Sequence, residues 1–220
     1  MDAPDLATLI EQTLRKTTAE DLWRLMLQED PVYRKIPEDL REEAVSQAAA
    51  VGREAARGLR ARVDTRDPET IAGKLKVSIV WTQEPHVFGK VVRTSTYTHR
   101  TRTITLYQGA VEEMNRMLAG GVGTVLGVAN VGPVYLAHEL FHHLEEDGLG
   151  RAADRLQVTT FQLGRFAVRS GIGQMSEIGA DAFSQDLLGL HVAPRLLDYV
   201  TIWMHNPEVG RRRLAALAGG

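Results

Sequence analysis

Two histidines four residues apart, His138 and His142, are the residues of this chain best placed to bind a metal ion. They lie in the segment 133–148, which begins with a proline and ends at a glycine, as helices often do. Residues four apart share one face of a helix, so both imidazoles can reach a single ion. Glu139 follows about 100° round the helix, where its carboxylate can take a proton from a water on the metal. The His-Glu-x-x-His pattern therefore predicts a zinc site with Glu139 as general base.

A catalytic zinc ion commonly has three protein ligands and one position for water, so a third ligand is needed. The helix-forming segment 175–190 offers Glu177 as that ligand. Asp181, four residues later on the same face, is expected to orient a ligand imidazole. Glu145 is a rival third ligand, because it shares the face of the two histidines, whereas His143 faces away and is expected to have a supporting or solvent-exposed role. Three ligands from one straight helix surround an ion poorly, and a carboxylate in the last turn opposes the helix dipole, so Glu177 is favoured.

The two segments together resemble the gluzincin zinc metallopeptidases, and in particular the ImmA/IrrE-like branch. The pattern of that branch is Ala-His-Glu-x-x-His followed by Glu-x-x-Ala-x-x-Phe-x-x-x-Leu-Leu, which is read here over 137–142 and 177–188. The resemblance implies His138, His142 and Glu177 as zinc ligands and Glu139 as general base. It also implies a small sheet followed by active-site helices. The residues 190–192 depart from the Met-Pro often found after the second motif.

Composition limits the class of protein. The chain has 220 residues, no cysteine and a formal net charge of −2. Without cysteine, a metal must be held by histidines and carboxylates. A nearly neutral charge gives no general attraction to nucleic acid or to an anionic membrane, and no apolar run is long and unbroken enough to span one. The first sixteen residues lack the pattern of a secretory signal, so we expect a soluble cytoplasmic protein.

Helical patterns occupy both ends of the chain, and strand-like segments lie between them. Residues 1–63 are expected to form a helical N-terminal region and residues 64–220 a zincin-like metallopeptidase domain. Strands are expected over 74–81, 87–97 and 101–107, in a small antiparallel sheet of three strands with the third strand at its edge. The glycine-rich run 120–132 is expected to be a flexible loop, with helix from there to the end. The predicted fold class is α+β.

These features predict a zinc-dependent endopeptidase acting on a peptide or protein substrate, which would add as a strand to the sheet edge near residues 101–107. The sequence does not choose among four possible hydrogen-bond donors to the developing oxyanion, namely Tyr107, His191, Tyr199 and His205. Manganese, iron or cobalt would also accept such ligands. Two alternatives stay open: a regulatory or sensor protein that binds a partner with little or no proteolysis, and a site whose histidines are merely packed. No nucleic-acid or membrane partner is predicted.

Overall fold

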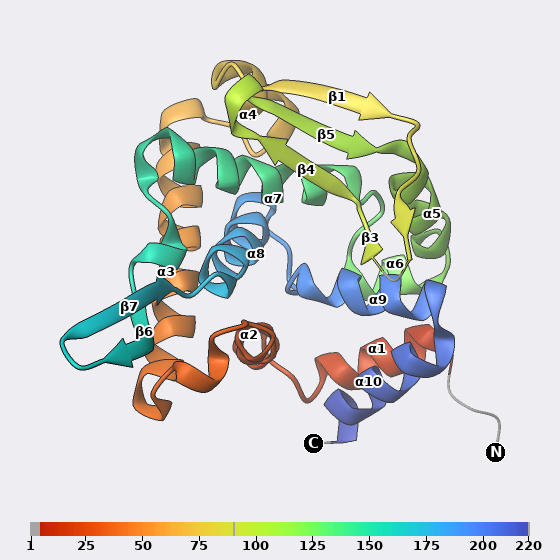
Figure 1. Cartoon of the computed structure of the whole chain (residues 1–220). Helices are drawn as coiled ribbons and strands as arrows, with labels where there is room; N and C mark the ends of the chain where they lie inside the picture. The colour runs from red at the N-terminus through yellow and green to blue at the C-terminus, as the bar shows by residue number, and fades with distance from the viewer. Residues whose placement is uncertain (1–4, 90, 220) are drawn as a thin grey trace.

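Ten α-helices and three small sheets form the fold in the computed structural model, which describes residues 5–89 and 91–219 (Figure 1). The helices are α1 (Leu6–Leu14), α2 (Ala19–Gln28), α3 (Glu38–Val63), α4 (Pro68–Lys74), α5 (Gln108–Leu118), α6 (Gly121–Leu126), α7 (Gly132–Leu144), α8 (Gln174–Leu188), α9 (Arg195–His205) and α10 (Pro207–Gly219). The strands are β1 (Ser78–Thr82), β2 (Val87–Phe88), β3 (Val91–Val92), β4 (Ser95–Thr98), β5 (Thr103–Tyr107), β6 (Gln157–Leu163) and β7 (Phe166–Gly171). The predicted α+β class is confirmed.

The three-stranded sheet beside α7 is mixed, and not antiparallel throughout. Its order is β1-β5-β4, in which β5 pairs parallel with β1 and antiparallel with β4. Strand β5 is therefore central, with Ile104 and Leu106 fully buried, and the prediction of an edge strand at 101–107 is wrong. A threonine-rich strand that starts with a charged residue resembles an edge strand, but here the more polar β4 takes the edge next to α7.

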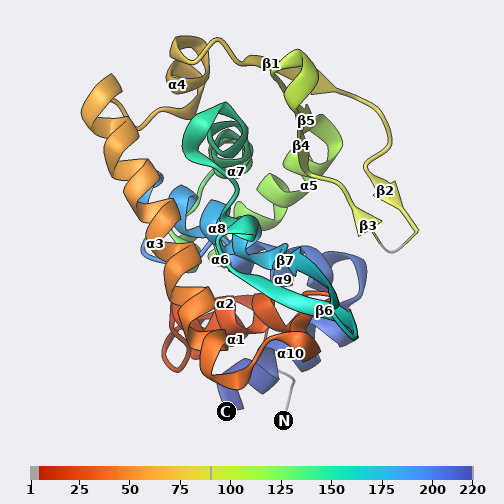
Figure 2. The same ribbon diagram turned by 60° about the vertical axis from the view of Figure 1, so that its left-hand side comes forward.

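Helix α7 lies between this sheet and the long helix α3, which runs down one side of the molecule (Figure 2). Helix α3 packs along α8, and α8 packs on α7. Where α3 contacts Gly179 of α8, it presents the small buried residues Ala48 and Gly52. Small side chains allow a close approach of two helices, so α8 is held tightly against α3.

The N-terminal helices share one hydrophobic core with the rest of the chain. Leu9 and Ile10 of α1 and Trp23 of α2 belong to the same buried cluster as the cores of α7, α8 and α9. The hydroxyl of Thr13 also donates to the carbonyl oxygen of Leu214 in α10. Residues 1–63 were predicted to form a helical N-terminal region. In the part of that range that the structure describes, its buried side chains pack against the segment 64–220.

Two local predictions are wrong. The glycine-rich run 120–132 contains the short helix α6, whose Val122 and Leu126 are buried, where a flexible loop was expected. Between α7 and α8 the chain forms the β6–β7 hairpin, where helix was expected, and Figure 1 shows this hairpin projecting beyond α3. Gly164, with φ of 57°, permits its tight turn. Every helix in the ranges 5–89 and 91–219 is too short or too polar to cross a membrane.

Candidate metal centre

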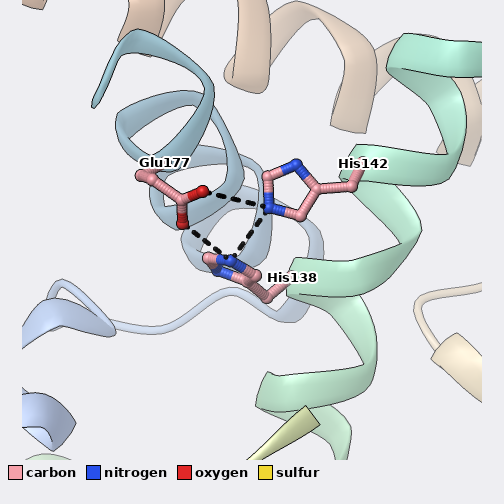
Figure 3. A group of neighbouring side chains, drawn as sticks. All are labelled: His138, His142 and Glu177. Atoms are coloured by element: carbon pink, nitrogen blue, oxygen red, sulfur yellow. Dashed lines mark hydrogen bonds and ion pairs between the residues drawn. The ribbon is translucent and has the colours of Figure 1, made fainter. Parts of the chain in front are cut away.

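Helix α7 presents His138 and His142 side by side on one face (Figure 3). The helix has a proline within its first two positions, and it buries Ala137, Leu140 and Phe141 completely. The Nε2 atoms of the two histidines lie 3.1 Å apart. Their side chains keep 29% and 21% of their surface exposed, so an ion can reach them from the solvent.

Glu177 of α8 completes the group. Its Oε2 lies 3.2 Å from Nε2 of His138, and its Oε1 lies 3.6 Å from Nε2 of His142. Two ligands bound at roughly 2.0–2.1 Å to a tetrahedral ion are separated by about 3.3 Å, close to these distances. Two imidazole nitrogens and a carboxylate oxygen are also ligand types that zinc and related divalent metals accept. The group His138–His142–Glu177, called the triad below, can therefore hold a metal ion.

The members of the triad shift the protonation of one another. Burial disfavours the charged form of His138, but the hydrogen bond and charge of Glu177, with the charges of Glu139 and Asp181, outweigh burial and raise the pKa of His138 to about 9. Burial would raise the pKa of Glu177, but the hydrogen bond from His138 and the charges of both histidines lower it to about 2. The negative charge that holds a proton on His138 also favours a divalent cation, which must displace that proton to bind.

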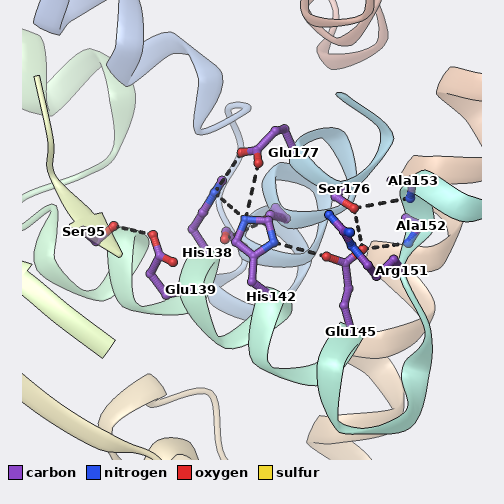
Figure 4. A network of polar contacts seen from close by, with 12 residues as sticks. Ser95, His138, Glu139, His142, Glu145, Arg151, Ala152, Ala153, Ser176 and Glu177 are labelled. Carbon is purple, nitrogen blue, oxygen red and sulfur yellow. Dashed lines mark hydrogen bonds and ion pairs between the residues drawn. The ribbon is translucent and has the colours of Figure 1, made fainter. Parts of the chain in front are cut away.

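Glu139 lies beside the triad without belonging to it. Its side chain is buried, and one carboxylate oxygen accepts a hydrogen bond of 2.8 Å from the hydroxyl of Ser95 (Figure 4). Ser95 is the first residue of the edge strand β4, so the strand fixes the carboxylate. Glu139 lines the same cavity as the triad, where it can exchange a proton with a water molecule. A lone serine in a polar strand has no motif, which is why the sequence did not single out Ser95.

Asp181 lies in α8, four residues after Glu177, and is buried. Its Oδ2 accepts a hydrogen bond of 2.6 Å from the indole nitrogen of Trp23 in α2. Burial raises the pKa of Asp181 to about 7, against the opposing effects of the Trp23 hydrogen bond and of the charge on His138. Among the described residues no hydrogen bond joins Asp181 to a histidine, so its role in orienting an imidazole stays a prediction.

Glu145 is not placed as a third ligand. It is buried at the start of a π-helical turn, Glu145–Leu149, that follows α7. Its Oε2 lies 3.2 Å from Nδ1 of His142, whereas the Nε2 atom of that ring faces His138 and Glu177. Its Oε1 accepts hydrogen bonds from the backbone N–H of Ala152 and from the hydroxyl of Ser176 (Figure 4). The sequence placed Glu145 on the face of the two histidines as a less favoured rival of Glu177, and its contact with Nδ1 of His142 was not predicted.

His143 faces away from the triad, as its position on the helix predicts. It is buried, and its Nδ1 lies 2.8 Å from the hydroxyl of Tyr97 in β4. Burial lowers the pKa of His143, which favours the neutral ring. The side chain therefore joins α7 to the edge strand and is not exposed to solvent.

A cleft passes across the triad. A cavity of about 680 Å³ is lined by the triad, by residues 91–97 and by parts of α2 and α9. A second cavity of about 480 Å³ shares Tyr97, Glu139, His142 and Glu177 with the first and extends toward Arg151. The cleft thus continues beyond the triad in two directions, with β4 along one wall.

The chain matches no protein-family model, no curated protein and no solved structure. The resemblance to the gluzincins therefore still rests on the motifs within 137–188, and it stays a prediction. The fold brings the three predicted ligand residues together from two helices, which the sequence motifs alone could not show.

The four possible oxyanion donors lie outside the cavity that contains the triad. The Tyr107 hydroxyl is bonded to Arg93, His191 lies near the carbonyl oxygen of Val125, the Tyr199 ring lies beneath Arg195, and His205 lines a neighbouring cavity. The cavity itself is lined by Tyr97, Tyr135, Arg93 and Arg195, whose sequence positions have no distinguishing motif. Tyr135 is three residues before His138 on α7, and that spacing is the one signal that would have identified it.

Proposed function

We propose that this protein is a zinc-dependent metallopeptidase, with His138, His142 and Glu177 as zinc ligands and Glu139 as general base. The observation that carries the proposal is the closeness of the three side chains in an open cleft: the two Nε2 atoms lie 3.1 Å apart, and the two carboxylate oxygens of Glu177 lie 3.2 and 3.6 Å from them. Zinc is the preferred metal because two histidines and a glutamate, with one position left for water, are a ligand set of catalytic zinc.

The residues around the triad can perform the proton transfers of peptide hydrolysis. When bound, zinc supplies Lewis-acid chemistry: it polarises a carbonyl group and makes water more acidic. Glu139 accepts the proton of the attacking water and passes it to the leaving amine. The hydrogen bond from Ser95 holds the Glu139 carboxylate in position before the substrate arrives, which lowers the cost of reaching a reactive geometry.

The cleft favours an extended polypeptide as substrate. Strand β4 is the edge of its sheet, and its residues Ser95, Thr96 and Tyr97 line the cavity of the triad. The outer side of an edge strand has unpaired backbone groups, to which an extended peptide can add as a further strand. Because the cleft continues beyond the triad in two directions, it can accept residues on both sides of the cleaved bond. We therefore propose an endopeptidase with β4, in place of residues 101–107, as the substrate-binding strand.

Substitution of Glu139 by glutamine tests this function. We expect the wild-type protein to retain zinc after dialysis and to cleave peptides in a mixed library analysed by mass spectrometry. Glu139→Gln should keep its zinc and lose cleavage by a factor of roughly 10² to 10⁴. The matched control is Glu112→Gln, an exposed residue of α5 that bonds to Gln108. Unchanged cleavage by Glu139→Gln refutes the assigned role, and a zinc-loaded wild type that cleaves nothing favours a regulatory, partner-binding protein.

A further inference from the structure

The buried carboxylate of Glu145 contacts both helices that carry the triad. Its side chain is only 3% exposed, and its Oε2 lies 3.2 Å from Nδ1 of His142 in α7. Its Oε1 accepts a hydrogen bond of 2.7 Å from the backbone N–H of Ala152 and one of 2.8 Å from the hydroxyl of Ser176 in α8. Figure 4 shows that these contacts lie on the side of His142 away from His138, and Ser176 immediately precedes Glu177.

The two nitrogens of the His142 ring have different partners. Nε2 lies 3.1 Å from Nε2 of His138 and 3.6 Å from Oε1 of Glu177, whereas Nδ1 faces Glu145. An ionised carboxylate can only accept hydrogen bonds. A neutral His142 ring must therefore carry its proton on Nδ1, and the lone pair of Nε2 is then available at the metal-binding position.

The same carboxylate connects the end of α7 to the beginning of α8. The Ser176 hydroxyl donates to Glu145 and accepts the backbone N–H of Ala153 at 3.3 Å, so the serine is held on both sides. Because Ser176 is next to Glu177, this contact limits the movement of the third ligand relative to the two histidines. A buried carboxylate is costly unless its oxygens are hydrogen-bonded, and here each oxygen has a partner.

We propose that Glu145 is a positioning residue of the metal site. It selects the Nδ1–H tautomer of His142 and holds α7 against α8, so that the three ligand atoms are in place before a metal binds. The proposal rests on the proposed metal site but not on peptide hydrolysis. Direct ligation by Glu145 does not fit these contacts, because its carboxylate reaches the His142 ring at Nδ1, away from the triad.

Substitution of Glu145 by glutamine tests the proposal, because an amide has one acceptor oxygen and one donor nitrogen. It cannot accept from His142 and from the Ala152–Ser176 pair at the same time. We expect zinc affinity, measured by competition with a chelator, to fall about 10- to 100-fold. The matched control is Glu146→Gln, since the neighbouring carboxylate pairs with Arg151 at 4.0 Å, and its zinc affinity should equal that of the wild type.

A nitrogen-15 NMR spectrum of the histidine rings in chelator-treated protein provides a readout that a general loss of packing would not change. The neutral His142 ring should be the Nδ1–H tautomer in the wild type and should shift toward the Nε2–H tautomer in Glu145→Gln. Ser176→Ala keeps the contact between Glu145 and His142, so it should retain the wild-type tautomer and lose less zinc affinity. It also serves as the test variant if Glu145→Gln does not fold.

Two results overturn the proposal: an Nε2–H tautomer of His142 in the wild type, or a zinc affinity of Glu145→Gln equal to that of Glu146→Gln. A wild-type protein that binds no zinc is a different failure, because it removes the proposed metal site. In that case the NMR spectrum still decides whether Glu145 selects the tautomer.

Discussion

Gly52 of α3 lies directly against Gly179 of α8: a Cβ atom on Gly52 would be 2.1 Å from the carbonyl oxygen of Gly179. It would also be 2.9 Å from the backbone nitrogen of Phe183. Both atoms belong to the backbone of the helix that carries Glu177, so neither can move without a shift of α8. The position of Glu177 therefore depends on the absence of a side chain at Gly52 on another helix.

Gly52→Ala is expected to destabilise the protein by about 1–3 kcal/mol, because overpacking forces the backbone to shift. Alanine has a higher helix propensity than glycine by roughly 1 kcal/mol, and this gain offsets part of the cost of overpacking. Urea unfolding measures the change. Gly58→Ala is the control in the same helix, since a Cβ there has no neighbour within 4 Å, and it should stabilise the protein by about 0.5–1 kcal/mol. Equal stability of the two variants would contradict the close helix contact.

Zinc is expected to raise the melting temperature through the triad. At a free concentration of about 1,000 times the dissociation constant, binding stabilises the folded state by roughly 4 kcal/mol. For a chain of this length, that corresponds to an increase of roughly 8–16 °C in Tm. Calorimetry with and without a chelator measures the shift, and Glu177→Gln should abolish most of it. An undiminished shift in Glu177→Gln would mean that zinc binds elsewhere.

Loss of the Ser95 hydroxyl is expected to reduce catalysis without reducing zinc binding. A hydrogen bond to a charged group contributes about 1.5–3 kcal/mol, so Ser95→Ala should lower kcat/KM by roughly 10- to 100-fold if Glu139 loses its position. Ser95→Thr keeps a hydroxyl and should retain most of the activity. The prediction is contradicted if Ser95→Ala and Ser95→Thr have the same kcat/KM, or if Ser95→Ala no longer binds zinc.

Asp181→Asn is expected to change the pH dependence of stability in chelator-treated protein. The pKa of Asp181 is raised from 3.8 to about 7 in the folded state, so the folded state binds this proton more tightly than the unfolded state. Its contribution to stability is full below pH 3.8 and is lost as the pH rises through about 7. The asparagine variant has no charge to bury and can still accept from Trp23, so above pH 7 it should be more stable than the wild type by roughly 1–4 kcal/mol.

Urea unfolding at pH 4 and at pH 8 checks this expectation, with the advantage of Asp181→Asn confined to the higher pH. If the difference in the free energy of unfolding between Asp181→Asn and the wild type is the same at both pH values, burial does not raise the pKa of Asp181. Zinc affinity of the same variant tests the predicted orienting role, because loss of a carboxylate that supports a ligand histidine lowers affinity by about 10- to 100-fold.

The parts of the site that were predictable from sequence are those encoded by local spacing. His138 and His142 lie one turn apart, and a helix brings them together whatever surrounds it. The role of Ser95 and the contact of Glu145 with α8 depend on contacts across the fold, between residues 95 and 139 and between 145 and 176, which no local pattern encodes. The position of β5 in the sheet is similar, because its sequence does not reveal which strands pair with it.

The missed hairpin is a different case, because its signal was present. Phe161 and Leu163 precede Gly164, and Phe166 and Val168 follow it, which is the alternation of two strands around a turn. The prediction of continuous helix after residue 132 did not take this alternation into account. All four apolar side chains are more than half exposed, so burial did not enforce the pattern either.

The contact between Thr13 and Leu214 joins residues 201 positions apart, and the Trp23–Asp181 bond joins residues 158 positions apart. During synthesis on the ribosome, α1 and α2 leave the exit tunnel long before the segments that cover them. Helices α1 and α2 pack on α10 and α8 as well as on α6 and α3, so the burial of Leu9, Ile10 and Trp23 is complete only when the later helices have been made. A nascent chain that has not yet made α8 to α10 is therefore expected to expose apolar surface on α1 and α2 that chaperones can bind.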